Sequence, residues 1–190
     1  RRFSDAGLAR LSSLKQLERL SLKDTKVSDG GLKSISGMKR LRELWLDKTT
    51  ISDQGLQQIR RIKTLRKLLI RDSRVSLLGV VKLSQAIPRI EIFFTGGRLQ
   101  AGRLELDPPL VEADLGSLKG AGNIRVLDLA GLRVSDTAIS SLARLPGLKS
   151  LVLKNCRITD NGVRELTKLG RLESIDLSRT QLTNNGLATL

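Results

Sequence analysis

The side chains that could carry chemistry in this chain are few, and the types that common catalytic sites need are missing. The 190 residues include no histidine and no tyrosine, and they include a single cysteine. The absence of histidine excludes Ser-His-Asp and Cys-His nucleophilic sites, histidine metal sites and histidine acid–base catalysis. We therefore expect no catalytic residue, no metal site and no cofactor, and we predict that the protein is not an enzyme.

The remaining candidates for catalysis have structural interpretations. Cys156 stands at a pattern position that other segments fill with Thr or Ser, so we expect a structural role rather than a reactive thiol. The carboxylates Glu105, Asp107 and Asp128 could lie near one another. A glycosidase or metal site would require such carboxylates in a pocket, and we favour a solvated face instead.

Outward aromatic and basic side chains are the stronger candidates, and they indicate binding. Strand alternation predicts that Trp45 and Leu69 share one outward column and that Arg71 and Phe93 share the next, with Lys67 close by. Trp, Phe and Arg are enriched in interface hot spots, and a contiguous apolar patch is typical of a binding surface. The alternative is that neighbouring domains of a longer protein cover this patch.

Positive charge suggests a second class of partner. The net charge is +15, and residues 1–95 contribute +12, from 21 Lys and Arg against 9 Asp and Glu. This excess favours an acidic partner, whether protein, nucleic acid or anionic lipid, although solubility alone could explain it. Few aromatic residues are present for stacking, which makes polyanion binding the weaker hypothesis. A basic row is predicted on the loops after the strands, at Lys26, Arg74, Arg133 and Arg157.

These candidates are positioned by an internal repeat. Six segments match the template L-x-x-L-x-L-x-x-T-x-V-S-D-x-G-L, and four of the five steps between them are 24 residues. Self-similarity at a period of 20 to 29 residues predicts a solenoid in which each coil packs only on its neighbours. The segments begin at Leu17, Leu41, Leu65, Ile124, Leu148 and Leu172.

One coil shows which elements the pattern predicts. Leu44 and Leu46 alternate with outward residues, which predicts a short strand with one buried face. Ser52 and Asp53 predict a helix start, because the hydroxyl can cap free N–H groups and the carboxylate favours the positive helix end. Each coil is therefore expected to hold one strand of a parallel sheet and one helical segment on the other side.

A column of glycines recurs after each predicted helix start. Gly55 and Gly79 belong to it, whereas Ala138 replaces glycine in its coil. This replacement indicates that the position requires a small residue, and we predict that the column packs the helix against its neighbour.

The repeat is interrupted between its third and fourth copies. Leu77 stands where the template has Asp, so we expect the irregular region to begin there. A strand template can be placed from Ile87 to Ile92. We predict a short coil without a helix at 87–100 and a distorted coil at 101–123, the alternative being one coil with a protruding loop. Such a region could determine binding specificity or be a tolerated insertion.

From Phe3 to Leu190, excepting about 88–123, the chain resembles the leucine-rich repeat superfamily, in particular its ribonuclease-inhibitor-like subclass. The segment from Leu153 to Val163 is similar to cysteine-containing repeats of F-box substrate receptors. The 24-residue coils with Thr in the cysteine position resemble repeats of uncharacterised bacterial proteins. The resemblance implies an α/β leucine-rich repeat solenoid, with a curved parallel sheet on the concave side and short helices on the convex side.

The resemblance also implies a function and a local contact. It implies a protein-interaction scaffold without shared catalytic residues. It further implies that the side chain at the position of Thr49 bonds backbone groups of adjacent turns.

We predict a single leucine-rich repeat domain over residues 1–190. Its regular coils span 1–86 and 124–190, and irregular coils or an insertion span 87–123. We predict no transmembrane segment, because no apolar run reaches 18 residues.

The two ends of the chain already fall within the repeat. Phe3 matches the place of Val27, and Leu190 matches the place of Ile35, so we expect a longer parent chain. The predicted function is a non-catalytic scaffold that binds an acidic protein on its concave face. The alternatives are polyanion binding through the basic N-terminal half and substrate recognition within a larger protein such as an F-box-type receptor.

Overall fold

The fold is an α/β solenoid of leucine-rich repeats. The computed structural model describes residues 3–108, 110 and 112–188, so the predicted place of Leu190 lies outside the described residues. The chain divides into two compact units, Arg1–Ala101 (unit 1) and Gly102–Leu190 (unit 2). The single domain expected over 1–190 stays a prediction. Within the described residues, no helix has the length and apolar character that crossing a membrane requires.

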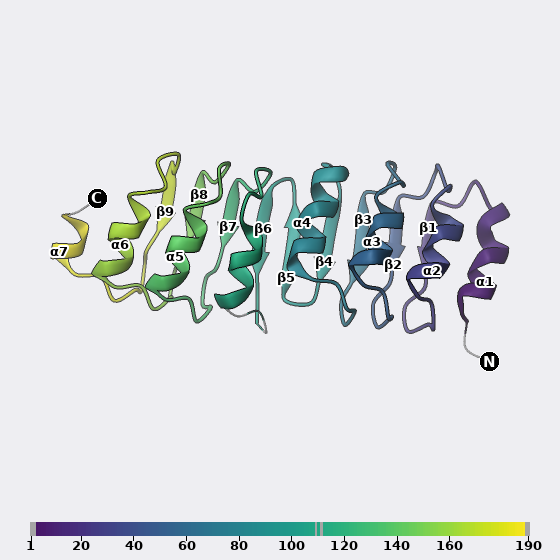
Figure 1. The fold of residues 1–190 in the computed structure, drawn as a ribbon, viewed down its shortest axis with the longest axis horizontal. Coiled ribbons are helices and arrows are strands. Elements are labelled where there is room, and N and C mark those ends of the chain that lie inside the picture. Colours follow the sequence, from purple (N-terminus) through teal and green to yellow (C-terminus); the bar gives the residue numbers. More distant parts are fainter. Residues whose placement is uncertain (1–2, 109, 111, 189–190) are drawn as a thin grey trace. The chain divides into compact units, whose positions relative to one another are not determined.

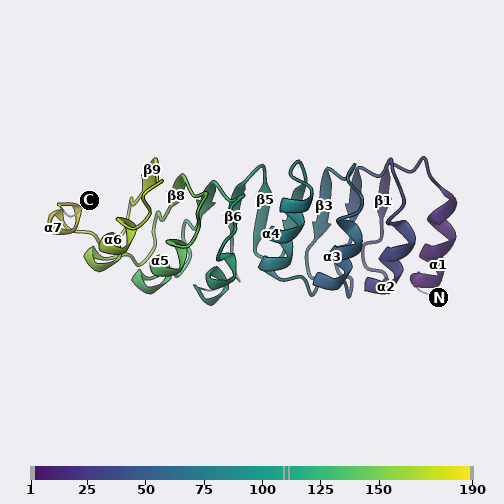
Figure 2. The same ribbon diagram turned by 45° about the horizontal axis from the view of Figure 1, so that its top comes forward.

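Unit 1 is built from alternating strands and helices. Figures 1 and 2 show its α-helices side by side on one face of its strands. Its helices are α1 (Asp5–Arg10), η1 (Leu11–Ser13), α2 (Asp29–Leu32), η2 (Lys33–Ile35), α3 (Asp53–Ile59) and α4 (Leu77–Ala86). Its strands are β1 (Arg19–Ser21), β2 (Glu43–Trp45), β3 (Lys67–Ile70), β4 (Glu91–Phe94) and β5 (Gly97–Gln100).

The first four strands of unit 1 are parallel, and their inward side chains form the core. Leu20, Leu44, Leu68 and Ile92 pair in register from strand to strand, and all four are buried. The helices cover this layer with their own apolar side chains, such as Leu56 and Ile59 of α3, which are buried. The prediction of a parallel sheet with short helices on its other side is thus confirmed for these coils.

Unit 2 repeats this arrangement. Leu104, Leu127, Leu151 and Ile175 pair in register along four parallel strands. The distorted coil predicted at 101–123 therefore contributes a strand to this sheet, and a 3₁₀ helix takes the place of its α-helix. The strands are β6 (Arg103–Leu106), β7 (Val126–Asp128), β8 (Ser150–Val152) and β9 (Ser174–Asp176). The helices are η3 (Glu112–Leu118), α5 (Asp136–Leu142), α6 (Asp160–Leu166) and α7 (Asn184–Leu187).

The start predicted for the coil at Ile87 is wrong by two residues. Leu68 pairs with Ile92, so the 24-residue step continues and this coil begins at Arg89. Both placements bury apolar side chains, since Ile87 is 2% exposed and Phe94 is 4% exposed. The apolar pattern therefore could not decide between the two starting positions, whereas the pairing of β4 with β3 does.

The irregular region also begins later than predicted. Leu77 opens α4, and the hydroxyl of Ser76 accepts a hydrogen bond from the N–H of Gly79 at 3.1 Å. This helix has ten residues where α3 has seven, and a turn at residues 88–89 then leads into β4. The departure from the repeat comes after Phe94.

The departure is a β-hairpin, which neither predicted alternative contained. β5 pairs antiparallel with β4, and Phe94 pairs with Gly97 across the two residues Thr95 and Gly96. Gly96 has a φ of 89°, a conformation that glycine adopts without strain. The strictly parallel sheet expected from the sequence is wrong at this strand, because a two-residue turn returns the chain antiparallel.

Each Asp at a helix start links two coils. The carboxylate of Asp29 accepts hydrogen bonds from the N–H of Ser52 at 2.8 Å and from its hydroxyl at 2.5 Å. Hydrogen bonds from the side chain and then the backbone of Thr183 lower the pKa of Asp160 in the same arrangement. The sequence predicted only that these Asp carboxylates favour the positive end of a helix. In the structure they also accept hydrogen bonds from the next coil. The same two bonds join Asp5 to Ser28, Asp53 to Ser76, Asp136 to Thr159 and Asp160 to Thr183.

The glycine column leaves room for these carboxylates. A Cβ at Gly79 would collide with the side chain of Asp53, and each of the other column glycines, from Gly31 onward, meets the Asp of the preceding coil in the same way. Ala138 fills the same place with another small residue and is buried. The requirement for a small residue is confirmed, and the neighbour that imposes it is the carboxylate of the coil before.

The Thr position bonds its own turn, contrary to what the resemblance implied. The hydroxyl of Thr49 donates to the carbonyl of Leu46 at 2.6 Å, three residues earlier in the same coil. Cys156 differs, because its Sγ donates to the carbonyl of Leu129 in the preceding coil at 3.1 Å. Burial raises the pKa of the Cys156 thiol, which agrees with the structural role expected for it.

Candidate protein-binding surface

Three large apolar side chains lie next to one another on the outer face of unit 1. Trp45 pairs with Leu69, and Leu69 pairs with Phe93, so the three occupy one row across β2, β3 and β4. All three are half-buried. The sequence placed Phe93 in the next column, with Arg71. The two-residue correction at Ile87 moves it into the row of Trp45 and makes the apolar strip continuous.

Cations surround the ring at the end of this row. Lys67 Nζ and Arg71 Cζ each lie 5.4 Å from the centroid of the Phe93 ring, and Arg98 Cζ lies 6.0 Å from it. These distances are within the range of cation–π attraction. We call Trp45, Leu69, Phe93, Lys67, Arg71 and Arg98 the aromatic patch. The structure thus brings all five predicted partner-binding residues together.

Arg98 is the member of the aromatic patch that sequence reasoning missed. It lies on β5, pairs with Phe93 across the hairpin, and has Nη1 3.7 Å from a carboxylate oxygen of Glu91. A signal was present, because Ile92, Phe94 and Leu99 alternate around Gly96-Gly97, and a glycine pair between alternating strands is typical of a hairpin. The interruption of the 24-residue repeat concealed it.

Two carboxylates near the aromatic patch differ in what they bind: Glu91 compensates part of the charge of Arg98, whereas Asp47 binds backbone. Asp47 is only 7% exposed, and its Oδ1 accepts a hydrogen bond from the backbone N–H of Arg71 at 3.0 Å. That carboxylate therefore holds the backbone beside the patch. The Arg71 side chain is exposed, so a carboxylate of a partner can reach the guanidinium.

The basic row predicted after the strands is divided between the two units. Lys26 and Arg74 lie in unit 1, two coils apart, with Thr50 at the same place in the coil between them. Arg133 and Arg157 lie in neighbouring coils of unit 2. All four side chains are exposed at the loop position expected for them.

Two of the three predicted carboxylates share one cation, whereas Asp107 is exposed. Glu105 pairs with Asp128 across β6 and β7, and Arg103 reaches both, at 2.7 Å and 3.1 Å. Its hydrogen bond with Glu105 raises the pKa of Arg103. The arginine therefore compensates part of the negative charge of this pair. The described residues contain no cluster of three or more His, Cys, Asp or Glu side chains able to hold a metal ion.

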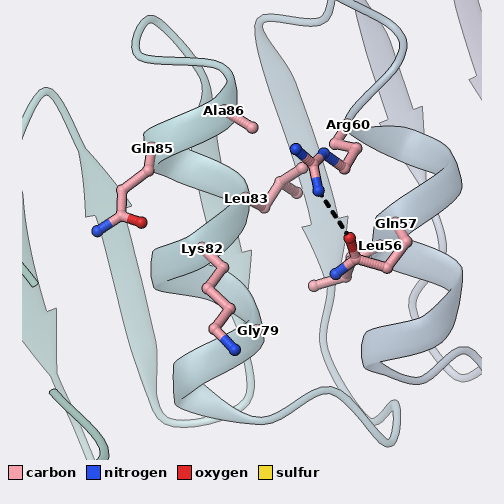
Figure 3. A pocket seen from close by; sticks show the side chains of 8 residues that line it. All are labelled: Leu56, Gln57, Arg60, Gly79, Lys82, Leu83, Gln85 and Ala86. Atoms are coloured by element: carbon pink, nitrogen blue, oxygen red, sulfur yellow. Dashed lines mark hydrogen bonds between the residues drawn. The ribbon is translucent and has the colours of Figure 1, made fainter.

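A groove of about 450 Å³ opens between α3 and α4 on the helix side of unit 1. Figure 3 shows the side chains that line it, including Leu56 and Leu83 at its base and Arg60, Gln57 and Lys82 around it. Arg60 Nη1 donates to the side-chain oxygen of Gln57 at 3.0 Å. No carboxylate is among the residues that line this groove.

Comparisons with known proteins found one family match over a short segment and similar solved structures. Residues 146–166 match the Leucine Rich repeat family. The sequence has no match among curated proteins. An internalin (inlF) from Listeria monocytogenes is among the similar solved structures, with a TM-score of 0.44 and 19% identity. The alignment covers 96% of this chain and 54% of the internalin, so the chain spans about half its length. The matched segment includes the cysteine-containing coil around Cys156, and the finer resemblances to the ribonuclease-inhibitor-like subclass and to F-box receptors stay predictions.

Proposed function

We propose that this protein is a non-catalytic scaffold that binds a protein partner through the aromatic patch on the face of its strands. Leucine-rich repeats commonly mediate protein–protein interaction, and a stack of strands offers one continuous surface for it. The observation that supports the proposal is the row formed by Trp45, Leu69 and Phe93. Aromatic and arginine side chains gathered at one place are typical of binding hot spots.

The charges around the row define the kind of partner. Lys67, Arg71 and Arg98 surround the Phe93 ring, so a bound segment that places an acidic side chain beside an apolar one would satisfy both components. Arginine can bind a carboxylate with two parallel hydrogen bonds. We therefore expect an acidic protein segment with at least one large apolar residue.

Selection from a random displayed peptide library tests this proposal, because it requires no named partner. Peptides selected on the intact chain should be rich in Asp, Glu and apolar residues. Trp45→Ala should weaken the selected peptides by about tenfold or more, which corresponds to about 1.4 kcal/mol. The melting temperature of this variant must be measured as well, because Trp45 is half-buried and its truncation also removes packing.

Val152→Ala is the matched control. Val152 occupies the same outward strand position in unit 2 and is also half-buried. It should leave affinity within about twofold, since truncations outside a hot spot cost little. Peptides that bind equally well to the Trp45→Ala variant, or that lack acidic residues, would refute the proposed surface.

A further inference from the structure

Cationic side chains gather on the edge of unit 1 where its strands begin. The turns that lead into β1, β2 and β3 are residues 14–18, 38–42 and 60–66, and they hold eight Lys and Arg against one carboxylate, Glu18. Parallel strands all begin on the same edge of a sheet, so these turns lie together. We call them the strand-start edge.

The opposite edge of the sheet has a smaller excess of positive over negative residues. The loops that leave the same three strands are residues 22–28, 46–52 and 70–76, and they hold five Lys and Arg against three Asp. The basic row predicted from the sequence, with Lys26 and Arg74, lies on this second edge. The larger excess of positive charge is therefore on the side of the strands that the sequence-based prediction did not identify.

A hollow on the strand-start edge is lined almost entirely by cations. It has a volume of about 160 Å³ and is lined by Lys39, Arg40, Arg42, Thr64 and Arg66. All four cationic side chains are exposed. Four cations around so small a space strongly favour an anion, because fixed charges of one sign raise the local concentration of the opposite sign.

Part of this hollow is already ordered. Arg66 Nη1 donates to the carbonyls of Lys63 and Leu65 at 3.0 Å and 2.9 Å. Arg40 donates to Gln16 at 2.6 Å and to Glu18 at 3.2 Å. These bonds hold two guanidinium groups in place before a ligand arrives, which reduces the entropy that binding must overcome.

The same position is basic in unit 2. Arg125 and Lys149 occupy the repeat places of Arg42 and Arg66, and with Arg171 they line a hollow of about 310 Å³. The equivalent residues of the flanking coils are Glu18 and Glu173, and Glu173 forms an ion pair with Lys149. Within each unit the cations at this place therefore occupy two neighbouring coils, and in unit 1 the other Lys and Arg residues of the strand-start edge add to their positive charge.

From this arrangement we infer that the strand-start edge of unit 1 binds the phosphate backbone of a nucleic-acid duplex. A duplex carries about one negative charge per 1.7 Å of axis, so a compact group of eight cations can contact several phosphates at once. Single strands are usually held by stacking on aromatic rings, and residues 14–18, 38–42 and 60–66 contain none. A protein partner would need an apolar centre, and no apolar residue lines the hollow. Binding through phosphates alone is independent of base sequence.

Fluorescence anisotropy of a labelled duplex of about 24 base pairs, titrated with the full chain between about 50 and 200 mM NaCl, tests this inference. Lys39→Gln/Arg42→Gln removes two exposed cations, and within the described residues neither side chain has a hydrogen bond or an ion pair. This variant should reduce the magnitude of the salt slope by about 1.8 and weaken binding at least about fivefold at the lower salt concentration. Two duplexes of unrelated sequence should bind equally.

Lys26→Gln/Arg74→Gln is the matched control, because it removes the same net charge from the opposite edge. It should weaken duplex binding less than about twofold. Equal losses for the two variants would refute the edge, since net charge alone would then explain binding. Absence of duplex binding at about 50 mM NaCl would also overturn the inference.

Two further probes distinguish other anions. Vesicles that contain phosphatidylserine and poly-glutamate should each bind more weakly than the duplex at equal concentration of anionic groups. Tighter binding to the vesicles would overturn the inference in favour of a membrane surface, and tighter binding to poly-glutamate would do so in favour of an acidic protein. Unchanged circular dichroism and melting temperature of both variants would show that folding is intact.

Discussion

At the scale of single residues, the coils are joined by a unit of three residues rather than by apolar contact alone. An Asp in one coil bonds the N–H and hydroxyl of a Ser or Thr in the next coil, and a glycine there leaves space for its carboxylate. Around Asp53 the partners are Ser76 and Gly79. The stability that one of these residues contributes therefore depends on the other two. A double-mutant cycle can measure this dependence.

The cycle combines Asp53→Ala with Gly79→Ala. Asp53→Ala should cost about 1–3 kcal/mol, because it leaves the N–H and hydroxyl of Ser76 without their acceptor. Gly79→Ala should cost about 1–3 kcal/mol in the native chain, since the new Cβ meets Asp53. In the Asp53→Ala background the same change should stabilise α4 by up to about 1 kcal/mol, because alanine favours a helix more than glycine does.

Urea unfolding of the four chains measures the coupling free energy. Additive costs, within about 0.5 kcal/mol, would contradict the proposed dependence of glycine on Asp.

At the scale of elements, the β4–β5 hairpin is the feature that separates this chain from a uniform repeat. It continues the row of Trp45 and Leu69 as far as Phe93 and adds Arg98 on the returning strand. Its turn depends on Gly96, which has a φ of 89°. The geometry of the aromatic patch is therefore tied to one backbone conformation.

Substitution of the turn glycine tests this dependence. Gly96→Ala should destabilise the chain by roughly 1–2 kcal/mol, because a Cβ is unfavourable at positive φ. Gly37→Ala should have the opposite sign, stabilising by up to about 1 kcal/mol, because its Cβ would enter open space and the unfolded chain loses freedom.

Hydrogen exchange followed residue by residue would locate the effect of Gly96→Ala. Faster exchange should be confined mainly to β4 and β5. An equal response to the two alanine substitutions would show that the turn conformation is unimportant.

At the scale of the whole molecule, positive charge is only weakly compensated. The chain carries +15, and residues 1–101 hold 22 Lys and Arg against 9 Asp and Glu. The ion pairs described in unit 1, Arg40–Glu18 and Arg98–Glu91, are partly exposed, and such pairs contribute little stability. Repulsion between like charges should therefore exceed attraction in the folded state.

Salt should stabilise the folded chain for this reason. Raising NaCl from about 20 to about 300 mM shortens the screening length severalfold and should raise the melting temperature by roughly 2–4 °C. Thermal unfolding followed by circular dichroism measures the change. The Lys39→Gln/Arg42→Gln variant should show a smaller rise, because part of the repulsion has been removed. A melting temperature that falls with salt would mean that attractive pairs dominate instead.

The sequence by itself determined the repeating parts of this protein. The positions of Leu20, Leu44 and Leu68 in the core follow from a 24-residue period and a two-residue alternation, both of which act within one coil. The five partner-binding candidates also came from this alternation, as did the distorted coil at 101–123. These features are local, so a pattern of residue types is sufficient to predict them.

Tertiary structure decided what depends on contacts between coils. The alignment of Ile92 with Leu68, the hairpin that brings Arg98 to Phe93, and the bonds from each Asp to the next coil join residues far apart in sequence. Several placements bury the same apolar area, so hydrophobic pattern alone could not choose among them. Backbone pairing between strands determines which placement is adopted. Each buried N–H and C=O needs a hydrogen-bond partner, and a shift of register would leave some of these groups without one.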